Sequence, residues 1–249
     1  MIMHPQLEEA FNQRRVLKVI SGLNNFDPSR VAAVVKAADR GGATFVDIAA
    51  DPNLVSLARR LTNLPICVSA VEPKQFISAI QAGADLIEIG NFDSFYAIGQ
   101  RFEAEEVLAL TRETRSLLPQ VTLSVTVPHI LTLDRQVQLA EELVQAGADI
   151  IQTEGGTSST PRSAGTLGLI EKAAPTLAAA YEISRAVAVP VLCASGLSSV
   201  TVPMAIAAGA AGVGVGSAIN QLDNEVAMVA VVRSLAEALK TVSLTRVRV

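Results

Sequence analysis

Amphipathic stretches alternate with short apolar runs along the chain, and the junction between them recurs four times. At each junction a stretch with apolar positions three or four residues apart ends at a Gly-Ala pair, and an apolar run follows at once. The four junctions begin at Gly42, Gly83, Gly147 and Gly209. Because glycine commonly terminates a helix, each junction predicts a helix that leads directly into a buried strand.

Four more apolar runs complete a regular alternation. One covers residues 15–20, and the other three follow or begin at a proline, over 65–69, 119–125 and 190–195. Eight near-continuous apolar strands that alternate with helices are typical of a parallel (β/α)₈ barrel. The sequence therefore predicts one such domain over residues 1–249. A doubly wound open sheet is the alternative, but no GxGxxG motif follows the first strand.

The helix starts and the chain ends fit this scheme. Pro28, Pro52 and Pro73 each follow an acidic residue, and proline is favoured in the first turn of a helix. Residues 5–14 predict a short N-terminal helix that caps the bottom of the barrel. The short C-terminal tail, residues 241–249, alternates apolar and polar positions, which is typical of an extended segment packed on a neighbour.

Composition bounds the class of protein. Half of the 249 residues are hydrophobic, which excludes a disordered chain. The formal net charge is −4, and without a basic surplus we expect no nucleic-acid partner. Residues 186–222 carry no charge, but prolines and glycines divide them, so they predict short buried elements and no membrane span. The acidic N-terminal segment disfavours a signal peptide, and we expect a cytoplasmic protein.

Alternation within the strands predicts which side chains enter the barrel. Alternate residues of a barrel strand face the surrounding helices, and the others face the axis. When the strongly apolar positions are turned outward, a largely polar set remains inside. This inward set is Lys18, Asp47, Glu88, Ser124, Thr126, Gln152, Glu154, Cys193 and, at the end of its strand, Ser195.

Lys18, Asp47 and Glu88 are the candidate catalytic residues. Buried charges are costly unless they are paired, so such groups form structural ion pairs or serve a function. In the catalytic interpretation Lys18 is a proton donor, a carbanion stabiliser or a Schiff-base amine that the carboxylates tune. In the structural interpretation it pairs with Asp47 or Glu88 and holds adjacent layers together. Lys18 precedes its loop by several residues, and this depth weighs against the catalytic role.

Glycine-rich loops follow the sixth, seventh and eighth strands. Loops in this part of a barrel commonly bind phosphate through backbone N–H groups, and glycine lets the main chain approach the anion. The alternative is that the glycines only permit tight turns. The candidate phosphate-binding residues are Gly155, Gly156, Ser195, Gly196, Gly216 and Ser217.

Two of these loops resemble a known superfamily. Residues 209–219 are similar to the eighth-strand phosphate motif of the phosphate-binding barrels, which include tryptophan synthase alpha subunits and thiazole synthases, and residues 194–197 resemble the seventh-strand motif. The resemblance implies a barrel that binds a phosphorylated small molecule. The paired carboxylates of the first group and the lysine of the second have no clear counterparts in this sequence.

A second resemblance spans nearly the whole chain. Residues 18–26, 87–96 and 152–157 resemble a family of hypothetical chloroplast open reading frame proteins, encoded in cyanobacteria and in plastid genomes. The family has no settled biochemical activity, so the resemblance implies fold and cellular setting, which is the stroma for the plastid members, and leaves the reaction open.

Other chemistry-bearing positions give weaker signals. Residues 91–103 hold four aromatic side chains that we expect beneath the loop or in a subunit interface, and residues 155–168 form a long polar loop with one charge, Arg162. His129 ends the fifth strand and is a candidate general acid or base. The sequence shows no His/Asp/Glu cluster, so it predicts no metal site and no cofactor, and Cys193 is interpreted as a core residue.

Two functions follow from these residues. The first is a lyase, isomerase or synthase that acts on a small phosphorylated metabolite, with the phosphate held by the last three loops. The alternative is a non-catalytic barrel that binds an anionic metabolite and keeps Lys18 as a structural ion pair. A homo-oligomer is compatible with either function.

Overall fold

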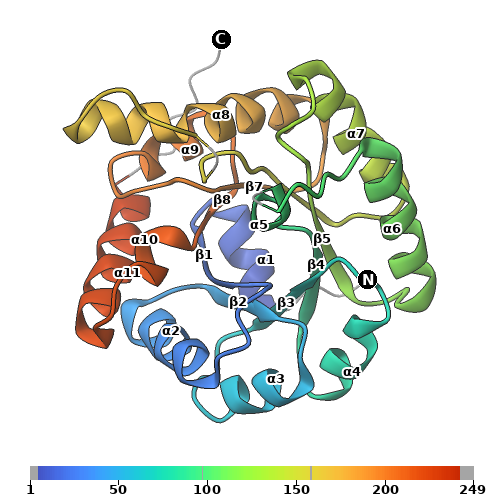
Figure 1. The fold of residues 1–249 in the computed structure, drawn as a ribbon, viewed down its shortest axis with the longest axis horizontal. Coiled ribbons are helices and arrows are strands. Elements are labelled where there is room, and N and C mark those ends of the chain that lie inside the picture. The colour runs from blue at the N-terminus through green and yellow to red at the C-terminus, as the bar shows by residue number, and fades with distance from the viewer. Residues whose placement is uncertain (1–4, 97, 158, 242–249) are drawn as a thin grey trace.

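Every apolar run of the sequence becomes a strand of one closed barrel in the computed structural model, which describes residues 5–96, 98–157 and 159–241. Within these ranges eight parallel strands follow one another around the barrel in chain order, and the last pairs with the first. Helices form an outer ring around the strands (Figure 1). The expected (β/α)₈ barrel is confirmed.

Strands and helices alternate as the sequence indicates. The strands are β1 (Val16–Gly22), β2 (Phe45–Ala49), β3 (Ile66–Ala70), β4 (Leu86–Ile89), β5 (Thr122–Thr126), β6 (Ile150–Gln152), β7 (Val191–Ala194) and β8 (Gly212–Val215). The helices are α1 (Pro5–Asn12), α2 (Pro28–Gly41), α3 (Pro52–Arg59), α4 (Gln75–Gln81), α5 (Asp93–Tyr96), α6 (Ala104–Leu117), α7 (Leu133–Gln145), α8 (Gly165–Ala186), α9 (Val202–Ala207), α10 (Ser217–Asn220) and α11 (Glu225–Lys240). The short helices α5 and α10 are additional to the regular alternation, and no periodic pattern in the sequence predicts them.

Acidic residues before two of the prolines cap helices. Asp27 and Asp51 each accept two backbone N–H groups at the start of α2 and α3, with proline in the first turn. Pro73 behaves differently, since α4 begins two residues later at Gln75 without a side-chain cap. The uncharged stretch 186–222 forms β7, α9, β8 and α10. Among the helices described here, none combines the length and apolar character of a membrane span.

Three of the four recurring junctions share a side-chain hydrogen bond to the preceding strand. The third residue of each of these junctions accepts a strand N–H: Thr44 Oγ1 accepts Leu17 N–H at 2.9 Å, and Asp149 Oδ2 accepts Leu123 N–H at 2.8 Å. Asp85 accepts Ile66 N–H in the third strand in the same way. These three junctions therefore connect the end of a helix to the start of the neighbouring strand, whereas the fourth has Ala211 at this position, without a side-chain acceptor.

Arginines of two outer helices bind the aspartates of two of these junctions. Arg115 of α6 binds Asp149 Oδ2 at 2.7 Å and donates to the carbonyl groups of Gly147 and Val121. Arg59 of α3 pairs with Asp85 in the same way. The bottom of the barrel is thus held by two matching sets of polar contacts.

The amino-terminal end of the barrel is filled by apolar side chains and closed by α1. Leu7 and Phe11 of α1 are buried against side chains that six strands send inward. This lower cluster consists of Leu7, Phe11, Val16, Phe45, Cys67, Leu86, Ile150 and Leu192. The expected capping helix is confirmed, although it ends at Asn12. Residues 242–249 of the tail lie outside the described residues.

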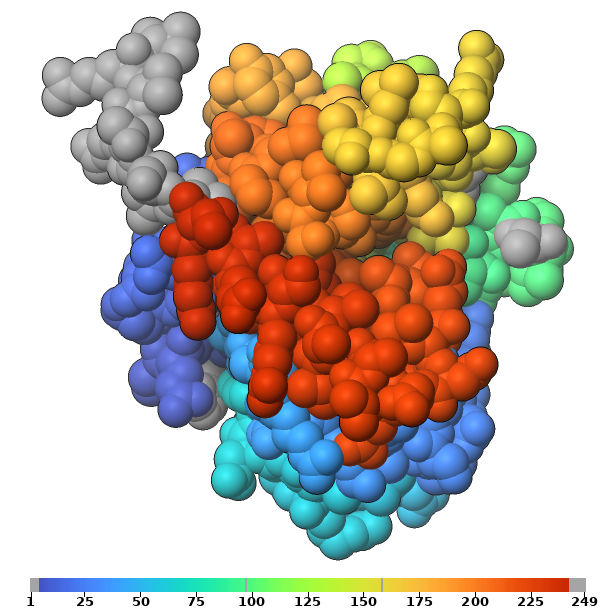
Figure 2. Space-filling model, turned by 90° about the vertical axis from the view of Figure 1, so that its left-hand side faces the viewer, coloured from blue at the N-terminus to red at the C-terminus, as the bar shows by residue number. Residues whose placement is uncertain are grey.

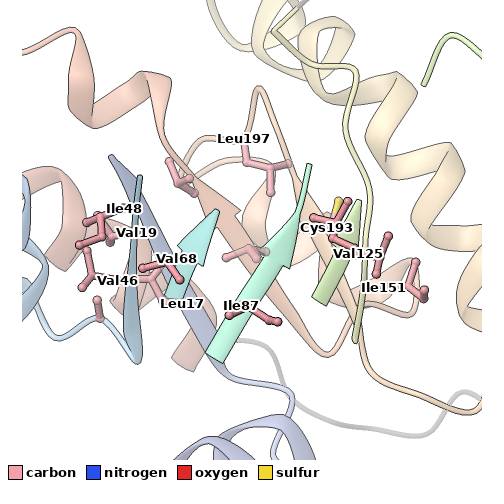
Figure 3. Packing of buried hydrophobic residues seen from close by; sticks show 14 of the residues in the cluster. Leu17, Val19, Val46, Ile48, Val68, Ile87, Val125, Ile151, Cys193 and Leu197 are labelled. Atoms are coloured by element: carbon pink, nitrogen blue, oxygen red, sulfur yellow. The ribbon is translucent and has the colours of Figure 1, made fainter. Parts of the chain in front are cut away.

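A larger apolar core fills the space between the strands and the helical ring. Figure 3 shows its inner side, where Val19, Val46 and Ile87 point outward from their strands. Cys193 belongs to this core and contacts Thr176 of α8, so the expectation that it faces the axis is wrong. The strand β7 is apolar on both sides, so its pattern could not distinguish the two faces.

The first and last outer helices close the ring. Helix α11 packs beside α2, and the two are seen together at the edge of the barrel (Figures 1 and 2). Gly41 permits this contact, because a Cβ atom there would lie 2.4 Å from Val232 Cβ. Any larger residue at this position would have to displace α11.

We expect Asp149→Ala to lower the free energy of unfolding by about 1–3 kcal/mol, because Leu123 N loses its acceptor and Arg115 its partner. Asp149→Asn should recover part of the loss, since an amide oxygen still accepts the N–H group. Urea denaturation of both variants measures the difference. Equal stability of Asp149→Ala and the unaltered chain would contradict the role of the junction.

Candidate functional site

A cleft opens at the carboxyl ends of the strands, where barrel enzymes hold their substrates. It has a volume of about 460 Å³ and lies between the loops that follow β1, β4 and β8, with Thr157 from the loop after β6. Its walls are mostly neutral amides and hydroxyls. They comprise Ile20, Ser21, Gly22, Leu23, Asn24, Asn25, Asn91, Asp93, Ser94, Thr157, Gly216, Ser217 and Asn220.

A smaller inner hollow of about 50 Å³ shares five of these lining residues and reaches the barrel interior. Gln152 and Glu154 line it, as do Thr153, Ala194 and Ser195. The cleft and the hollow together connect the surface with the polar centre of the barrel.

Backbone strain is concentrated at this opening. Asn91 and Ser195 line the inner hollow with φ angles of 64° and 78°, in the left-handed region that residues other than glycine rarely adopt. Strained residues persist where the surrounding structure holds them in place, and they cluster at functional sites. Their location therefore singles out the inner hollow.

Below the hollow, Lys18 lies at the barrel axis with its ammonium group fully buried. Its Nζ atom is 2.6 Å from Glu88 Oε2, 3.2 Å from Asp47 Oδ2 and 2.9 Å from Gln152 Oε1. Glu88 and Asp47 are therefore its counter-charges and Gln152 Oε1 accepts a hydrogen bond from it, whereas Asp47 Oδ2 has no hydrogen-bond partner among the described residues. The structure thus brings all three predicted catalytic residues together.

Hydroxyl and amide groups complete this axial network, which we define as Lys18, Asp47, Ser69, Glu88, Ser124, Thr126 and Gln152. Ser69 donates to Asp47 Oδ1 at 2.5 Å, and Ser124 donates to Glu88 Oε2 at 2.8 Å. Gln152 Nε2 donates to Glu88 Oε1 at 2.8 Å and to Thr126 Oγ1 at 3.1 Å. Six strands contribute to the network.

The network stabilises the charge on its lysine. Burial lowers the pKa of Lys18, but the attraction of Asp47 and Glu88 together outweighs burial and raises the pKa above its ordinary value. Burial raises the pKa of Asp47 to about 6, although Lys18 opposes this. Lys18 is therefore a cation at neutral pH.

Gln152 separates Lys18 from the inner hollow. Its amide lines the hollow and also accepts the hydrogen bond from Lys18. Gly214 lies next to it, and a Cβ atom there would lie in ordinary contact with Gln152 Oε1 at 3.4 Å but too close to Ala194 Cβ at 2.9 Å. A substrate in the hollow would meet Gln152 before Lys18.

A second polar group, the rim cluster, surrounds Glu154 at the ends of four strands. It consists of Asp93, Tyr96, His129, Glu154 and Ser195. Glu154 Oε2 accepts the backbone N–H groups of Phe92 and Asp93 at 2.9 and 3.3 Å. Glu154 Oε1 accepts the Tyr96 hydroxyl at 2.7 Å and the His129 N–H at 3.1 Å. Glu154 therefore connects the loops that follow β4, β5 and β6.

The His129 ring lies between two carboxylates of this cluster. Its Nδ1 atom is 3.2 Å from Glu154 Oε1 and 3.5 Å from Asp93 Oδ1. Asp93 also accepts the Ser195 hydroxyl at 2.8 Å, and Ser195 Oγ accepts Thr157 N–H at 2.6 Å. The expected acid–base candidate His129 is thus part of a larger set than the sequence indicated.

Burial and mutual charge shift the pKa values of the rim cluster. Burial raises the pKa of Glu154, and the neighbouring charge of Asp93 adds to this. Burial lowers the pKa of His129, but the hydrogen bond to Glu154 and the charges of Glu154 and Asp93 raise it, and the net direction is upward. The pKa values of Glu154 and His129 are thus both raised by this environment.

The structure divides the predicted phosphate-binding residues into two groups. Ser195, Gly216 and Ser217 line the inner hollow. Gly156 and Gly196 instead face each other behind it, and a Cβ atom at Gly156 would lie 2.2 Å from the carbonyl oxygen of Ser195. Gly155 has a φ of 115° and packs near His129. The second group serves the close packing of two loops.

The two long loops also differ in role. Phe92 and Phe102 stack with ring centroids 4.6 Å apart and are buried beneath the loop 91–103, while Tyr96 joins the rim cluster. Arg162 is exposed and lies outside the lining of the cleft. The backbone N–H groups of Arg162 and Ser163 donate to Glu171 of α8. These bonds fix the loop that precedes α8 against this helix.

Sequence reasoning missed the assembly of the rim cluster. Glu154 was expected inside the barrel, His129 at a strand end and Tyr96 among the aromatic side chains of residues 91–103, but Asp93 carried no signal because it lies in a loop without periodicity. The expectation that no His/Asp/Glu cluster exists is wrong: Asp93, His129 and Glu154 offer ligand atoms within 4.8 Å of one another.

We expect Lys18→Met to lower the free energy of unfolding by about 3–5 kcal/mol, because Glu88 and Asp47 are left buried without their cation. Adding Asp47→Asn and Glu88→Gln to this variant should restore most of the stability, since the uncompensated charges are gone. Denaturant unfolding of the two variants measures both effects. Near-native stability of Lys18→Met would contradict a structural role and favour the catalytic one.

Asp47 should make stability depend on pH. Its folded-state pKa of about 6 lies above the ordinary value of 3.8, so the folded chain binds this proton more tightly than the unfolded chain does. The resulting stabilisation is fully present below the unfolded pKa and is lost as the pH rises through about 6. The difference in unfolding free energy between the unaltered chain and Asp47→Asn, measured from acid to neutral pH, should fall accordingly. A constant difference would contradict the raised pKa.

Solved structures with a similar fold cover almost the whole chain. Thiamine phosphate pyrophosphorylase from Pyrococcus furiosus superposes with a TM-score of 0.62 at 18% identity, over 92% of this chain and 98% of that one. (S)-3-O-geranylgeranylglyceryl phosphate synthase from Thermoplasma acidophilum gives 0.61 at 14% identity, over 96% and 99%. N-(5′-phosphoribosyl)anthranilate isomerase from Pyrococcus furiosus gives 0.56 at 14%, over 90% and 98%. At these identities the likeness shows the fold alone.

Some proteins of known sequence are much more similar to this chain than these solved structures are. The uncharacterized protein ycf23 of Cyanophora paradoxa is 42% identical over 228 residues, which are 91% of this chain and 93% of the relative. The ycf23 protein of Porphyra purpurea is 38% identical over 241 residues, 97% of this chain and 91% of the relative. A family described as "Protein of unknown function (DUF561)" matches residues 3–245. The expected family resemblance is confirmed, and the chain belongs to the DUF561/ycf23 family.

Proposed function

We propose that this barrel is an enzyme of the lyase, isomerase or synthase type that acts on a small phosphorylated metabolite in the cleft. The convergence of three loops carries the proposal. Thr157, Ser195 and Ser217, from the loops after β6, β7 and β8, line one inner hollow at the carboxyl ends of the strands. This is the region where barrels commonly hold phosphate.

The phosphate would be held by main-chain and hydroxyl groups. Helix α10 begins at Ser217 after Gly216, without a side-chain cap on its first N–H groups. The first N–H groups of a helix have no partner within it, and they favour an anion. The Ser217 hydroxyl adds a donor on the same wall, whereas the Ser195 hydroxyl already donates to Asp93 Oδ2.

The fold neighbours support the choice of a phosphorylated ligand. Their names include a thiamine phosphate enzyme, a glyceryl phosphate synthase with sn-glycerol-1-phosphate and a phosphoribosyl anthranilate isomerase. These are synthases and an isomerase on barrels of the same layout. For the present chain we propose a reaction of this general type, and we do not propose a particular substrate.

Proton transfer in the hollow would fall first to the carboxylates that line it. Glu154 lines the inner hollow and Asp93 lines the cleft, and both lie beside His129. The candidate catalytic residues of the axial network, Lys18, Asp47 and Glu88, do not line the inner hollow and would act from below it. A substrate reaches Lys18 directly only if the Gln152 side chain moves. The rim cluster therefore meets a substrate before the axial network does.

A binding barrel without catalysis is the second candidate, and the closed axial network favours it. Inside the barrel the Lys18 ammonium group has two counter-charges, Glu88 and Asp47, and donates a hydrogen bond to Gln152. An ion network satisfied in this way can stabilise the fold without taking part in chemistry. Turnover of a bound phosphate ester would distinguish the two candidates.

We expect Gly216→Asp to abolish phosphate binding, because it places bulk and negative charge beside the proposed anion. Isothermal titration with inorganic phosphate and with sn-glycerol 1-phosphate measures the affinity, and glycerol is the uncharged control. Ser217→Asp should act in the same way, whereas Ser199→Asp, in an exposed part of the loop after β7 that does not line the cleft, should leave binding unchanged. Unchanged affinity in both cleft variants would remove the phosphate proposal.

A further inference from the structure

We propose that Asp93, His129 and Glu154 form a binding site for one divalent metal ion at the mouth of the barrel. Their side chains come from α5 and from the loops after β5 and β6, and one ligand atom of each lies within 4.8 Å of the others. The site is defined by residues of this chain, and cation binding stands whether or not a phosphate ester binds.

Two of the three separations between donor atoms match those of a coordination shell. His129 Nδ1 lies 3.2 Å from Glu154 Oε1 and 3.5 Å from Asp93 Oδ1. Ligand atoms about 2.1 Å from a metal ion are separated by about 3.0 Å at octahedral and about 3.4 Å at tetrahedral angles. A cation can therefore enter between the three atoms with small movements of the side chains.

The supporting contacts hold the ligands in this arrangement. Two backbone N–H groups bind Glu154 Oε2 and the Tyr96 hydroxyl binds Oε1, while the Ser195 hydroxyl binds Asp93 Oδ2. Ligands of metal sites are oriented by such outer hydrogen bonds. Glu154 Oε1 and Asp93 Oδ1, the two oxygens nearest the ring, are the ones turned toward His129.

Charge and burial also favour a cation. The side chains of Asp93 and Glu154 are 3% and 2% exposed, and two carboxylates so close and so buried repel each other. Among the described residues, no lysine or arginine forms an ion pair with Glu154. A divalent ion would compensate both carboxylates at once.

The position leaves room for further ligands. Glu154 lines the inner hollow and Asp93 lines the cleft, so water or an oxygen of a bound molecule can complete the coordination from that side. Three protein ligands with open positions are the pattern of catalytic rather than structural metal sites. One imidazole and two carboxylates suit Mn²⁺ or Zn²⁺ better than Ca²⁺, which prefers oxygen ligands alone.

Titration of the chelator-treated full chain with Mn²⁺, and separately with Zn²⁺, tests the site by calorimetry. We expect one ion per chain, with the affinity reduced at least tenfold in His129→Ala and in Asp93→Asn. Glu182→Gln, on an exposed part of α8, is the matched control and should bind like the unaltered chain. Manganese bound to the chain should also show an altered electron paramagnetic resonance spectrum that His129→Ala abolishes.

Glu154→Gln is a weaker test, because Glu154 connects three loops and its loss can unfold them; His129→Ala keeps those contacts and decides the matter. Absence of saturable binding of both ions, or unchanged affinity in His129→Ala, would overturn the site. A chain that binds no cation but loses phosphate affinity in Gly216→Asp would overturn this inference alone. Cation binding without phosphate binding would overturn only the proposed function.

Discussion

The buried ammonium group of Lys18 is the interaction on which the barrel interior depends. A cation removed from water is costly unless every hydrogen finds an acceptor and a counter-charge lies near. Asp47 and Glu88 supply the counter-charge from β2 and β4, and Gln152 supplies a hydrogen-bond acceptor from β6. Since β4 and β6 are not neighbours of β1 in the barrel, one side chain connects strands across the axis. The ion pairs of Lys18 therefore connect the strands in the middle of the barrel. Below them, the lower end of the barrel is filled with apolar side chains.

This requirement explains small residues on the other strands. The carboxylates have acceptor positions beyond those that Lys18 uses, and Ser69 and Ser124 donate to them. Thr126 accepts a hydrogen bond from the Gln152 amide. The residues that look inconspicuous in sequence are therefore those that complete the hydrogen bonding of the charged ones. Gln152 also connects the axial network to the inner hollow, so the two polar levels of the barrel share one amide.

The fold was predictable because each unit repeats the same local chemistry. The junctions at Gly42, Gly83 and Gly147 combine a helix stop with a strand whose neighbour they bind through one side chain. Alternation also placed Lys18, Asp47 and Glu88 inside, since the opposite faces of their strands are strongly apolar. It failed for Cys193, where both faces of β7 are apolar. The rim cluster could not be predicted, because loops without periodicity bring its members together only after the barrel has closed.

The electrostatics of the mouth connect the proposed substrate with the proposed metal ion. The described lining of the cleft and hollow contains the carboxylates of Asp93 and Glu154 and no lysine or arginine. A phosphate ester in the hollow would therefore approach two negative groups, and only uncharged donors, backbone N–H groups and a hydroxyl, line the wall to offset the repulsion. Positive charge between the carboxylates, as a proton on His129 or as a bound cation, removes much of this penalty because the distances are short and the site is buried. Anion binding and cation binding at this mouth should thus favour each other, and the affinity for either ligand should rise when the other is present.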